Sequence, residues 1–151
     1  MCRNWQAQGA AKKNGSLLKV GNDSSAKEEE MNKQERRAWF LERVGLMLTD
    51  LSNQGFKFMC YEFYRTPEEQ ALDYAKGASQ IRKGLHQVWQ AMDLAHLING
   101  KISWADGPAY IALDRTAKKY GLSTGRNWKT LKDLNHVESV LGWVDLGLIK
   151  G

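Results

Sequence analysis

Four side chains in the second half of the sequence have the types and spacing of a hydrolytic metal centre. His86 precedes Asp93 by seven residues, and a later Asp133-Leu-Asn-His136 segment supplies a second imidazole and a second carboxylate. Two neutral imidazoles and one carboxylate can bind Zn²⁺ and leave a fourth position for water. That water needs a base, and Asp133 lies three residues from His136. Taken singly, each of these residues is better explained as a structural or solvated group, so the combination is what favours a metal site.

The third histidine, His96, is the weaker candidate ligand. Asp93 and His96 are three residues apart in a segment with the pattern of a strand, so their side chains should point to opposite faces of the sheet. His86 instead precedes the strand in a loop that begins at Gly84, where the chain can turn the imidazole towards Asp93.

The elements that must position these residues are predicted from capping and turn signals. Asn32 with Glu35, and Thr66 with Pro67 and Glu69, are typical of helix starts. Asn-Gly between two apolar runs is a strong hairpin signal. The expected elements are a helix from Asn32 to Gly55, a buried strand over 56–64, a helix from Thr66 to about Lys76, a hairpin over 90–104, a helix capped by Asp106 from Pro108 to Gly121, and short strands. This order predicts an α+β domain with a small antiparallel sheet and helices packed on it.

The length and composition of the chain limit the number of domains and the class of protein. The chain has 151 residues and 17.2 kDa, which fits one domain. Residues 1–30 are rich in Gly, Ser, Lys and Glu and are predicted to be a flexible N-terminal tail, so 31–151 is the predicted folded domain. No apolar run approaches the roughly 20 residues that span a bilayer. Cys2 and Cys60 are not expected to form a disulfide, and Cys60 is predicted to be a buried thiol.

The net charge of +5 favours an anionic partner such as nucleic acid, acidic lipid or cell wall. Basic residues are scattered and do not alternate with aromatic residues in a stripe, which argues against nucleic-acid binding.

Three segments in order carry a specific resemblance. They are Arg65-Thr66-Pro67-Glu68-Glu69-Gln70, then Gly84-Leu-His86-Gln-Val-Trp-Gln-Ala91-Met-Asp93-Leu94, then Trp128-Lys-Thr-Leu-Lys-Asp133-Leu-Asn-His136-Val-Glu138. Together they resemble the zinc peptidoglycan peptidases of the D-alanyl-D-alanine carboxypeptidase family, whose pattern is Arg-Thr-x-Glu-Glu-Gln, Ser-x-His-x-x-Gly-x-Ala-x-Asp and Asp-x-x-His. The most similar branch is the L-alanyl-D-glutamate endopeptidases of bacteriophage endolysins. The resemblance covers roughly residues 32–140, and it implies the D-alanyl-D-alanine carboxypeptidase/hedgehog-like fold with the zinc site at the sheet.

The resemblance also implies roles for individual residues. His86, Asp93 and His136 would bind Zn²⁺, and Asp133 would be the general base and acid. Arg65 would stabilise the developing oxyanion; the alternative is a structural salt bridge with a neighbouring glutamate, for which the options are Glu62, Glu68 and Glu69.

Two further residues each have two possible interpretations. Trp128 either lines the substrate groove or is simply buried, and Glu138 either orients His136 or is an exposed charge. The chain departs from the family pattern at Trp89, where glycine is expected, at Gly84, where serine is expected, and at Asn135, where many relatives have proline. Trp89 is expected to alter the loop beside the metal.

The implied function is hydrolysis of the L-Ala–D-Glu bond in peptidoglycan stem peptides during host cell lysis. The alternatives are a D-Ala-D-Ala carboxypeptidase or dipeptidase, and an inactive wall-binding module. The expected partner is bacterial peptidoglycan, with no nucleic acid, no membrane insertion and a monomeric state. Because no signal peptide is evident, the expected location is the host cytoplasm until another protein permeabilises the membrane and exposes the wall. A virion-associated wall hydrolase also fits.

Overall fold

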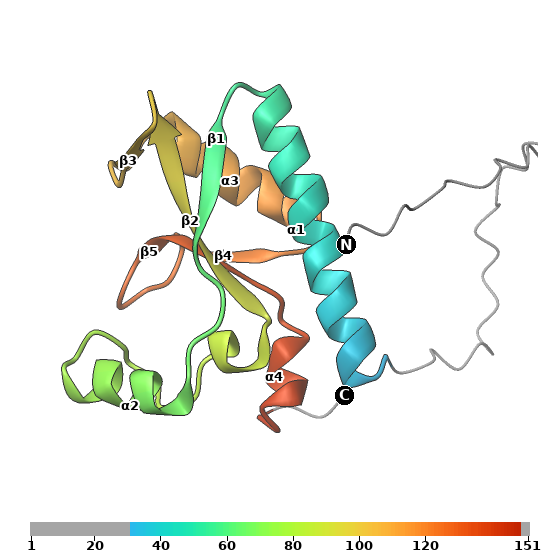
Figure 1. Cartoon of the computed structure of the whole chain (residues 1–151), viewed down its shortest axis with the longest axis vertical. Coiled ribbons are helices and arrows are strands. Elements are labelled where there is room, and N and C mark those ends of the chain that lie inside the picture. Colours follow the sequence, from blue (N-terminus) through green and yellow to red (C-terminus); the bar gives the residue numbers. More distant parts are fainter. Residues whose placement is uncertain (1–30, 149–151) are drawn as a thin grey trace, which may run out of the picture.

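The computed structural model describes residues 31–148, so the predicted tail over 1–30 lies outside the described residues. The elements, labelled in Figure 1, are α1 (Lys33–Asn53), β1 (Lys57–Glu62), α2 (Pro67–Ala75), the 3-10 turn η1 (Leu85–Val88), β2 (Ala91–Ile98), β3 (Lys101–Ser103), α3 (Pro108–Lys119), β4 (Ser123–Gly125), β5 (Asp133–Glu138) and α4 (Gly142–Asp145). The predicted α+β class with a small antiparallel sheet is confirmed. Among these helices, none has the length and apolar character needed to cross a membrane.

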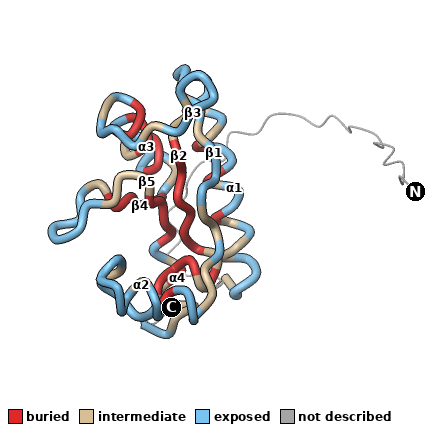
Figure 2. The backbone as a smooth tube through the Cα atoms, turned by 60° about the vertical axis from the view of Figure 1, so that its left-hand side comes forward, coloured by how far each residue is buried: buried red, intermediate tan, exposed pale blue. Residues whose placement is uncertain are grey.

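The sheet is built around β2. The strand order is β1-β2-β5-β4, and β3 pairs with the far end of β2. Every pairing is antiparallel. β5 pairs with the first residues of β2 and β3 with the last, so the two ends of β2 lie in different surroundings. The backbone of β2 is buried along most of its length (Figure 2).

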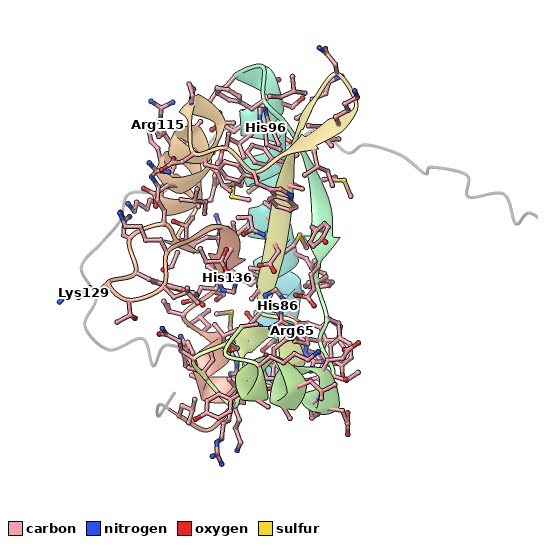
Figure 3. The ribbon with its side chains drawn as sticks, turned by 90° about the vertical axis from the view of Figure 1, so that its left-hand side faces the viewer. Arg65, His86, His96, Arg115, Lys129 and His136 are labelled. Atoms are coloured by element: carbon pink, nitrogen blue, oxygen red, sulfur yellow. The ribbon has the colours of Figure 1, made fainter. Side chains whose placement is uncertain are left out.

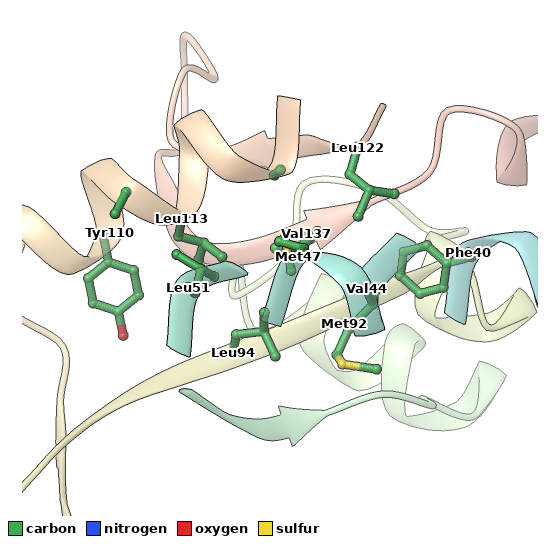
Figure 4. Close-up of a cluster of buried hydrophobic side chains, with 12 residues drawn as sticks. Phe40, Val44, Met47, Leu51, Met92, Leu94, Tyr110, Leu113, Leu122 and Val137 are labelled. Atoms are coloured by element: carbon green, nitrogen blue, oxygen red, sulfur yellow. The ribbon is translucent and has the colours of Figure 1, made fainter. Parts of the chain in front are cut away.

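The hydrophobic core lies between the sheet and the helices α1 and α3 (Figure 4). Helix α1 contributes residues at helical spacing, all at most 3% exposed: Phe40, Val44, Met47 and Leu51. Helix α3 contributes Tyr110 and Leu113, and β2 contributes Met92 and Leu94. Because Met92 and Leu94 are buried against the helices, the residues that alternate with them point to the opposite face of β2. That opposite face is available for chemistry.

The local signals act as the sequence predicts. Asn32 Oδ1 accepts hydrogen bonds from the backbone N–H groups of Gln34 and Glu35, and the Asn32 backbone N–H donates to the Glu35 carboxylate, which completes a capping box. The hairpin turn places Asn99 and Gly100 at φ values of +48° and +75°, the left-handed backbone that an Asn-Gly turn requires.

Two expectations are wrong in detail. The strand β1 is an edge strand paired only with β2, so most of its residues are exposed and Cys60 is an exposed thiol instead of a buried one. The N-cap of α3 is Gly107, without a side-chain hydrogen bond, and Asp106 pairs with Arg126 instead of capping the helix. Aromatic content predicted a strand correctly at β1 but could not distinguish an edge from a centre.

Candidate metal centre

Asp93 and His136 lie directly opposite each other on β2 and β5, so their side chains emerge on the same face of the sheet. His86 reaches them from η1, the turn immediately before β2. Asp93 Oδ1 is 3.1 Å from His136 Nδ1 and 3.3 Å from His86 Nε2, and the two ring nitrogens are 3.3 Å apart. Figure 3 shows His86 and His136 close together beside β2. These three side chains, all buried, could hold a metal ion.

The outer nitrogen of each imidazole is already engaged. His86 Nδ1 lies 3.2 Å from the carbonyl oxygen of Phe63, and His136 Nε2 lies 3.0 Å from Glu138 Oε2. A proton on each of these nitrogens leaves His86 Nε2 and His136 Nδ1 as lone-pair donors that face Asp93. Histidine ligands of zinc are held in this way, by a carbonyl or carboxylate on the far nitrogen. The donor set therefore fits Zn²⁺ with three protein ligands.

The charges within the cluster reinforce one another. Although burial opposes ionisation, hydrogen bonds with His136 and His86 hold the pKa of Asp93 below its usual range. Burial likewise disfavours the charged form of His136, but hydrogen bonds with Asp93 and Glu138 raise its pKa to about 9. A metal cation can replace this positive charge between the two carboxylates, which is why a ligand set of this kind attracts one.

Asp133 shares a cavity of about 460 Å³ with the three candidate ligands. Burial, followed by the nearby charge of Asp93, raises the pKa of its carboxyl group, which makes the carboxylate a stronger base. Gly125 on β4 pairs with Asp133, and a Cβ at Gly125 would lie 2.5 Å from the Asp133 carbonyl oxygen. Only glycine permits this close approach of β4, which sets where Asp133 enters the cavity.

Arg65 lies at the wall of the same cavity and takes part in an ion pair. Its Nε donates to Glu62 Oε1 at 3.1 Å, and its Nη2 also pairs with Glu62. Its Nη1 donates to Gln70 at 3.1 Å and lies 3.4 Å from Asp73. The structural salt bridge with Glu62 is therefore present, and Arg65 also lines the cavity, so the two interpretations of this residue are compatible.

Gln70 was not singled out by the sequence, although it ends the Arg65–Gln70 motif. Its side chain is 1% exposed; its Oε1 accepts from Arg65, and its Nε2 donates to Ser79 Oγ at 2.9 Å and to the Ile81 carbonyl at 2.7 Å. Gln70 thus ties α2 to Arg65 and to the 79–81 segment of the cavity wall. The signal available in the sequence was its place at the end of the Arg65–Gln70 motif.

The structure decides between the two interpretations of Trp128 and of Glu138, and it shows how Trp89 is accommodated. Trp128 lines the cavity, with its ring 4.9 Å from that of His136. Glu138 is 7% exposed and contacts His136. Trp89 has φ +56°, so it adopts the left-handed backbone that explains the glycine expected there. Its ring stacks on Tyr64 at 4.3 Å and lies under the Arg37 guanidinium at 4.2 Å, contacts that offset the backbone strain.

His96 lies on the opposite face of β2, near the end of the strand far from the cluster (Figure 3). Its ring packs among Phe56, Phe58 and Tyr110, with ring centroids 5.4–6.4 Å away. The structure thus places it half-buried on the core face of β2, apart from the candidate ligands.

Comparison with known proteins finds relatives among wall peptidases. The chain is 30% identical over 91 residues to the L-alanyl-D-glutamate peptidase of Listeria phage A118, a match that covers 57% of this chain and 31% of that protein. The chain therefore spans about a third of the length of this curated relative. No protein-family profile matches the chain.

Among solved structures, the L-Ala D-Glu endopeptidase ChiX of Serratia marcescens superposes with a TM-score of 0.57 and 25% identity, over 72% of this chain and 86% of ChiX. The vancomycin-resistance D,D-dipeptidase VanXYg superposes with a TM-score of 0.49 and 17% identity, over 67% of this chain and 49% of that one.

Proposed function

We propose that this chain, which is related in sequence and fold to the L-alanyl-D-glutamate peptidases, is a zinc peptidase that hydrolyses the L-Ala–D-Glu bond of peptidoglycan stem peptides. The observation that supports it most directly is the placement of Asp133 in one cavity with His86, Asp93 and His136. A purely structural metal site has no use for a half-buried carboxylate beside it that is not a ligand. The catalytic unit in this proposal is the domain over residues 31–151.

Each residue then has a defined task. His86 Nε2, His136 Nδ1 and Asp93 Oδ1 would hold Zn²⁺, which when bound supplies a Lewis acid and lowers the pKa of water. Asp133, whose pKa is raised by burial, accepts a proton from the attacking water and returns it to the leaving amine. Glu138 and the Phe63 carbonyl hold the two imidazoles in the tautomers that binding requires.

Arg65 places a guanidinium at the cavity wall, paired with Glu62 and close to Asp73. Its contacts with Glu62 and Gln70 immobilise the guanidinium, so it can stabilise negative charge in the transition state without reorganising. The same charge favours an acidic substrate residue such as D-Glu beside it. Because a terminal D-Ala carboxylate would be attracted equally, the preference for the L-Ala–D-Glu bond rests on the similarity to the L-alanyl-D-glutamate peptidases.

The biological setting in this proposal is lysis of a bacterial cell by a phage. The related protein from Listeria phage A118 supports a role at the host cell wall. The chain would accumulate in the host cytoplasm as a monomer and reach peptidoglycan once the membrane is permeabilised.

Mass spectrometry of digested peptidoglycan tests the proposal. Purified walls are incubated with the zinc-loaded chain, with and without a chelator, and new termini are identified. New D-Glu amino termini that disappear with the chelator are expected. Release of D-Ala would favour the carboxypeptidase alternative, and no cleavage of several wall types would favour a binding module.

A further inference from the structure

Two exposed aromatic side chains meet on the sheet beside the metal centre. Tyr61 on β1 is 60% exposed and Trp104, the residue after β3, is 48% exposed. Their rings pack edge to face, with centroids 5.1 Å apart and an interplanar angle of 85°. We call this pair the aromatic corner. Large aromatic rings exposed together on a folded domain indicate a binding surface more often than isolated ones do.

The aromatic corner lies on the same face of the sheet as Asp93. Ser103 pairs with His96, whose ring is in the core, so the next residue, Trp104, points to the opposite face. β1 and β3 flank β2 on opposite sides at this end, so the rings of Tyr61 and Trp104 meet over β2. On the core face that space is filled by the rings of Phe58, His96 and Tyr110, which leaves the face that carries Asp93 and Ala95.

The position of the aromatic corner along β2 gives its approximate distance from the candidate metal ligands. The residue of β2 on this face next to the corner is Ala95, which is 0% exposed and two residues from Asp93. Two residues of a strand span about 6.6–6.8 Å. The 460 Å³ cavity with Arg65 extends from the cluster towards α2 and η1, at the opposite end of β2. A substrate centred on the cluster therefore meets the cavity that contains the Arg65 guanidinium in one direction and an uncharged aromatic corner in the other.

We propose that the aromatic corner binds the sugar that carries the stem peptide. This rests on the proposed function, and it extends the substrate from a peptide to a muramyl peptide. In such a substrate the L-Ala nitrogen is acylated by the lactyl group of muramic acid. One residue reaches about 3.3–3.6 Å, and the lactyl group adds a similar length, so the sugar begins about 7 Å from the scissile carbonyl. That matches the spacing along β2, and it places D-Glu on the side of Arg65.

The chemistry of the corner suits a sugar ring. A pyranose has an apolar face of C–H groups that packs on the electron-rich face of an indole or phenol ring. Rings at right angles offer two such faces to one ligand. Neither side chain carries a charge at neutral pH, which agrees with a neutral sugar and contrasts with Arg65 at the other end of the site.

A pair of matched substrates tests the proposal on the zinc-loaded full chain. One is N-acetylmuramyl-L-Ala-D-Glu-L-Lys, and the other replaces the sugar and lactyl group with a propionyl group. The ratio of kcat/KM for the two substrates is expected to be about tenfold or more in favour of the sugar. The ratio should fall about 5- to 10-fold in Trp104→Ala and in Tyr61→Ala. Tyr61→Phe should keep it, because the ring and not the hydroxyl makes the contact.

The control is Ile111→Ala, which removes a side chain of similar exposure (52%) from α3, on the other side of the sheet. It should keep the ratio of the unsubstituted chain. A ratio near one in the unsubstituted chain, or a ratio unchanged in Trp104→Ala, would overturn the proposal. So would a dimer in sedimentation that Trp104→Ala dissociates, because the corner would then bind a second copy.

A binding measurement separates this proposal from the proposed function. Saturation-transfer NMR with the N-acetylglucosaminyl-N-acetylmuramyl disaccharide needs no cleavage. If neither peptide is cleaved, the proposed function fails. Loss of disaccharide binding in Trp104→Ala would still support sugar binding at the aromatic corner. Disaccharide binding that is absent, or unchanged in Trp104→Ala, would reject sugar binding at the corner.

Discussion

On one face of β2, His96 packs among aromatic rings; on the other, His86 and His136 converge on Asp93. Residue type does not explain the difference, since all are imidazoles. What separates them is the parity of the strand position and the cross-strand partner, because Asp93 is opposite His136 whereas His96 is opposite Phe58 and Ser103. One face of this strand therefore stabilises the fold, and the other, which we call the metal face, is free to carry charge.

Among the substitutions at the metal centre, Asp133→Asn should have the largest effect on turnover. Loss of the base is expected to lower kcat by about 10²- to 10⁴-fold, and zinc affinity should stay within a few-fold because Asp133 is not among the candidate ligands. Turnover of muropeptides and zinc content by mass spectrometry measure the two quantities. Asp106→Asn, which changes an exposed aspartate paired with Arg126, is the matched control. Full activity in Asp133→Asn would remove it as the base.

Leu94→Ala tests the opposite face one position from Asp93. Leu94 is fully buried in the core, so the substitution should lower the free energy of unfolding by about 2–5 kcal/mol. Zinc affinity of the folded protein should change little, since Leu94 points away from the cluster. Chemical denaturation and zinc titration are compared with Ile111→Ala, which should cost at most about 0.5 kcal/mol. If Leu94→Ala abolished zinc binding in the folded state, the two faces would not be independent.

Glu138→Gln removes the charge of the carboxylate that holds His136 on the metal face. The buried Glu138 carboxylate accepts from His136 Nε2, and an amide of the same shape holds the ring less strongly. Zinc affinity is expected to fall about 10- to 100-fold, measured by competition with a chromophoric chelator. Glu42→Gln, an exposed glutamate on α1, should leave the affinity unchanged. An equal loss in both variants would point to net charge instead of this contact.

Local signals predicted the elements well because each acts over a few residues. The capping boxes at Asn32 and Thr66 and the Asn-Gly turn were recognised from short patterns, and they form as expected. The grouping of His86, Asp93 and His136 was also predicted, but through strand parity combined with a family resemblance. Spacing in sequence alone does not reveal that Asp93 and His136 are opposite each other on paired strands.

What escaped prediction depends on contacts between distant segments. Cys60 was expected to be buried because its neighbours are apolar, and edge position is decided by which strands pair. Gln70 and Gly125 gain their importance from the 79–81 segment and from Asp133. Trp89 departs from the family pattern, yet its left-handed backbone persists because Tyr64 and Arg37 stack on the ring.

The pH dependence of zinc binding gives the mildest test of the metal face. Without metal, hydrogen bonds with Asp93 and Glu138 raise the pKa of His136 to about 9 against the effect of burial. The stabilisation from the charged ring is complete below its unfolded pKa of about 6.5 and is lost as pH rises through about 9. Zinc must displace this proton. Its affinity for the folded protein should therefore increase by up to tenfold per pH unit below about pH 9, and level off above.

Chelator competition at fixed free zinc measures this slope, with the chelator calibrated at each pH. In Glu138→Gln one of the two partners that raise the pKa of His136 loses its charge, so the plateau should begin at a lower pH than in the unsubstituted chain. In His96→Gln, on the core face, the folded protein should keep the original slope, because that ring is remote from the cluster. A flat profile in the unsubstituted chain would mean that zinc displaces no proton from His136, and the ligand set would have to be revised.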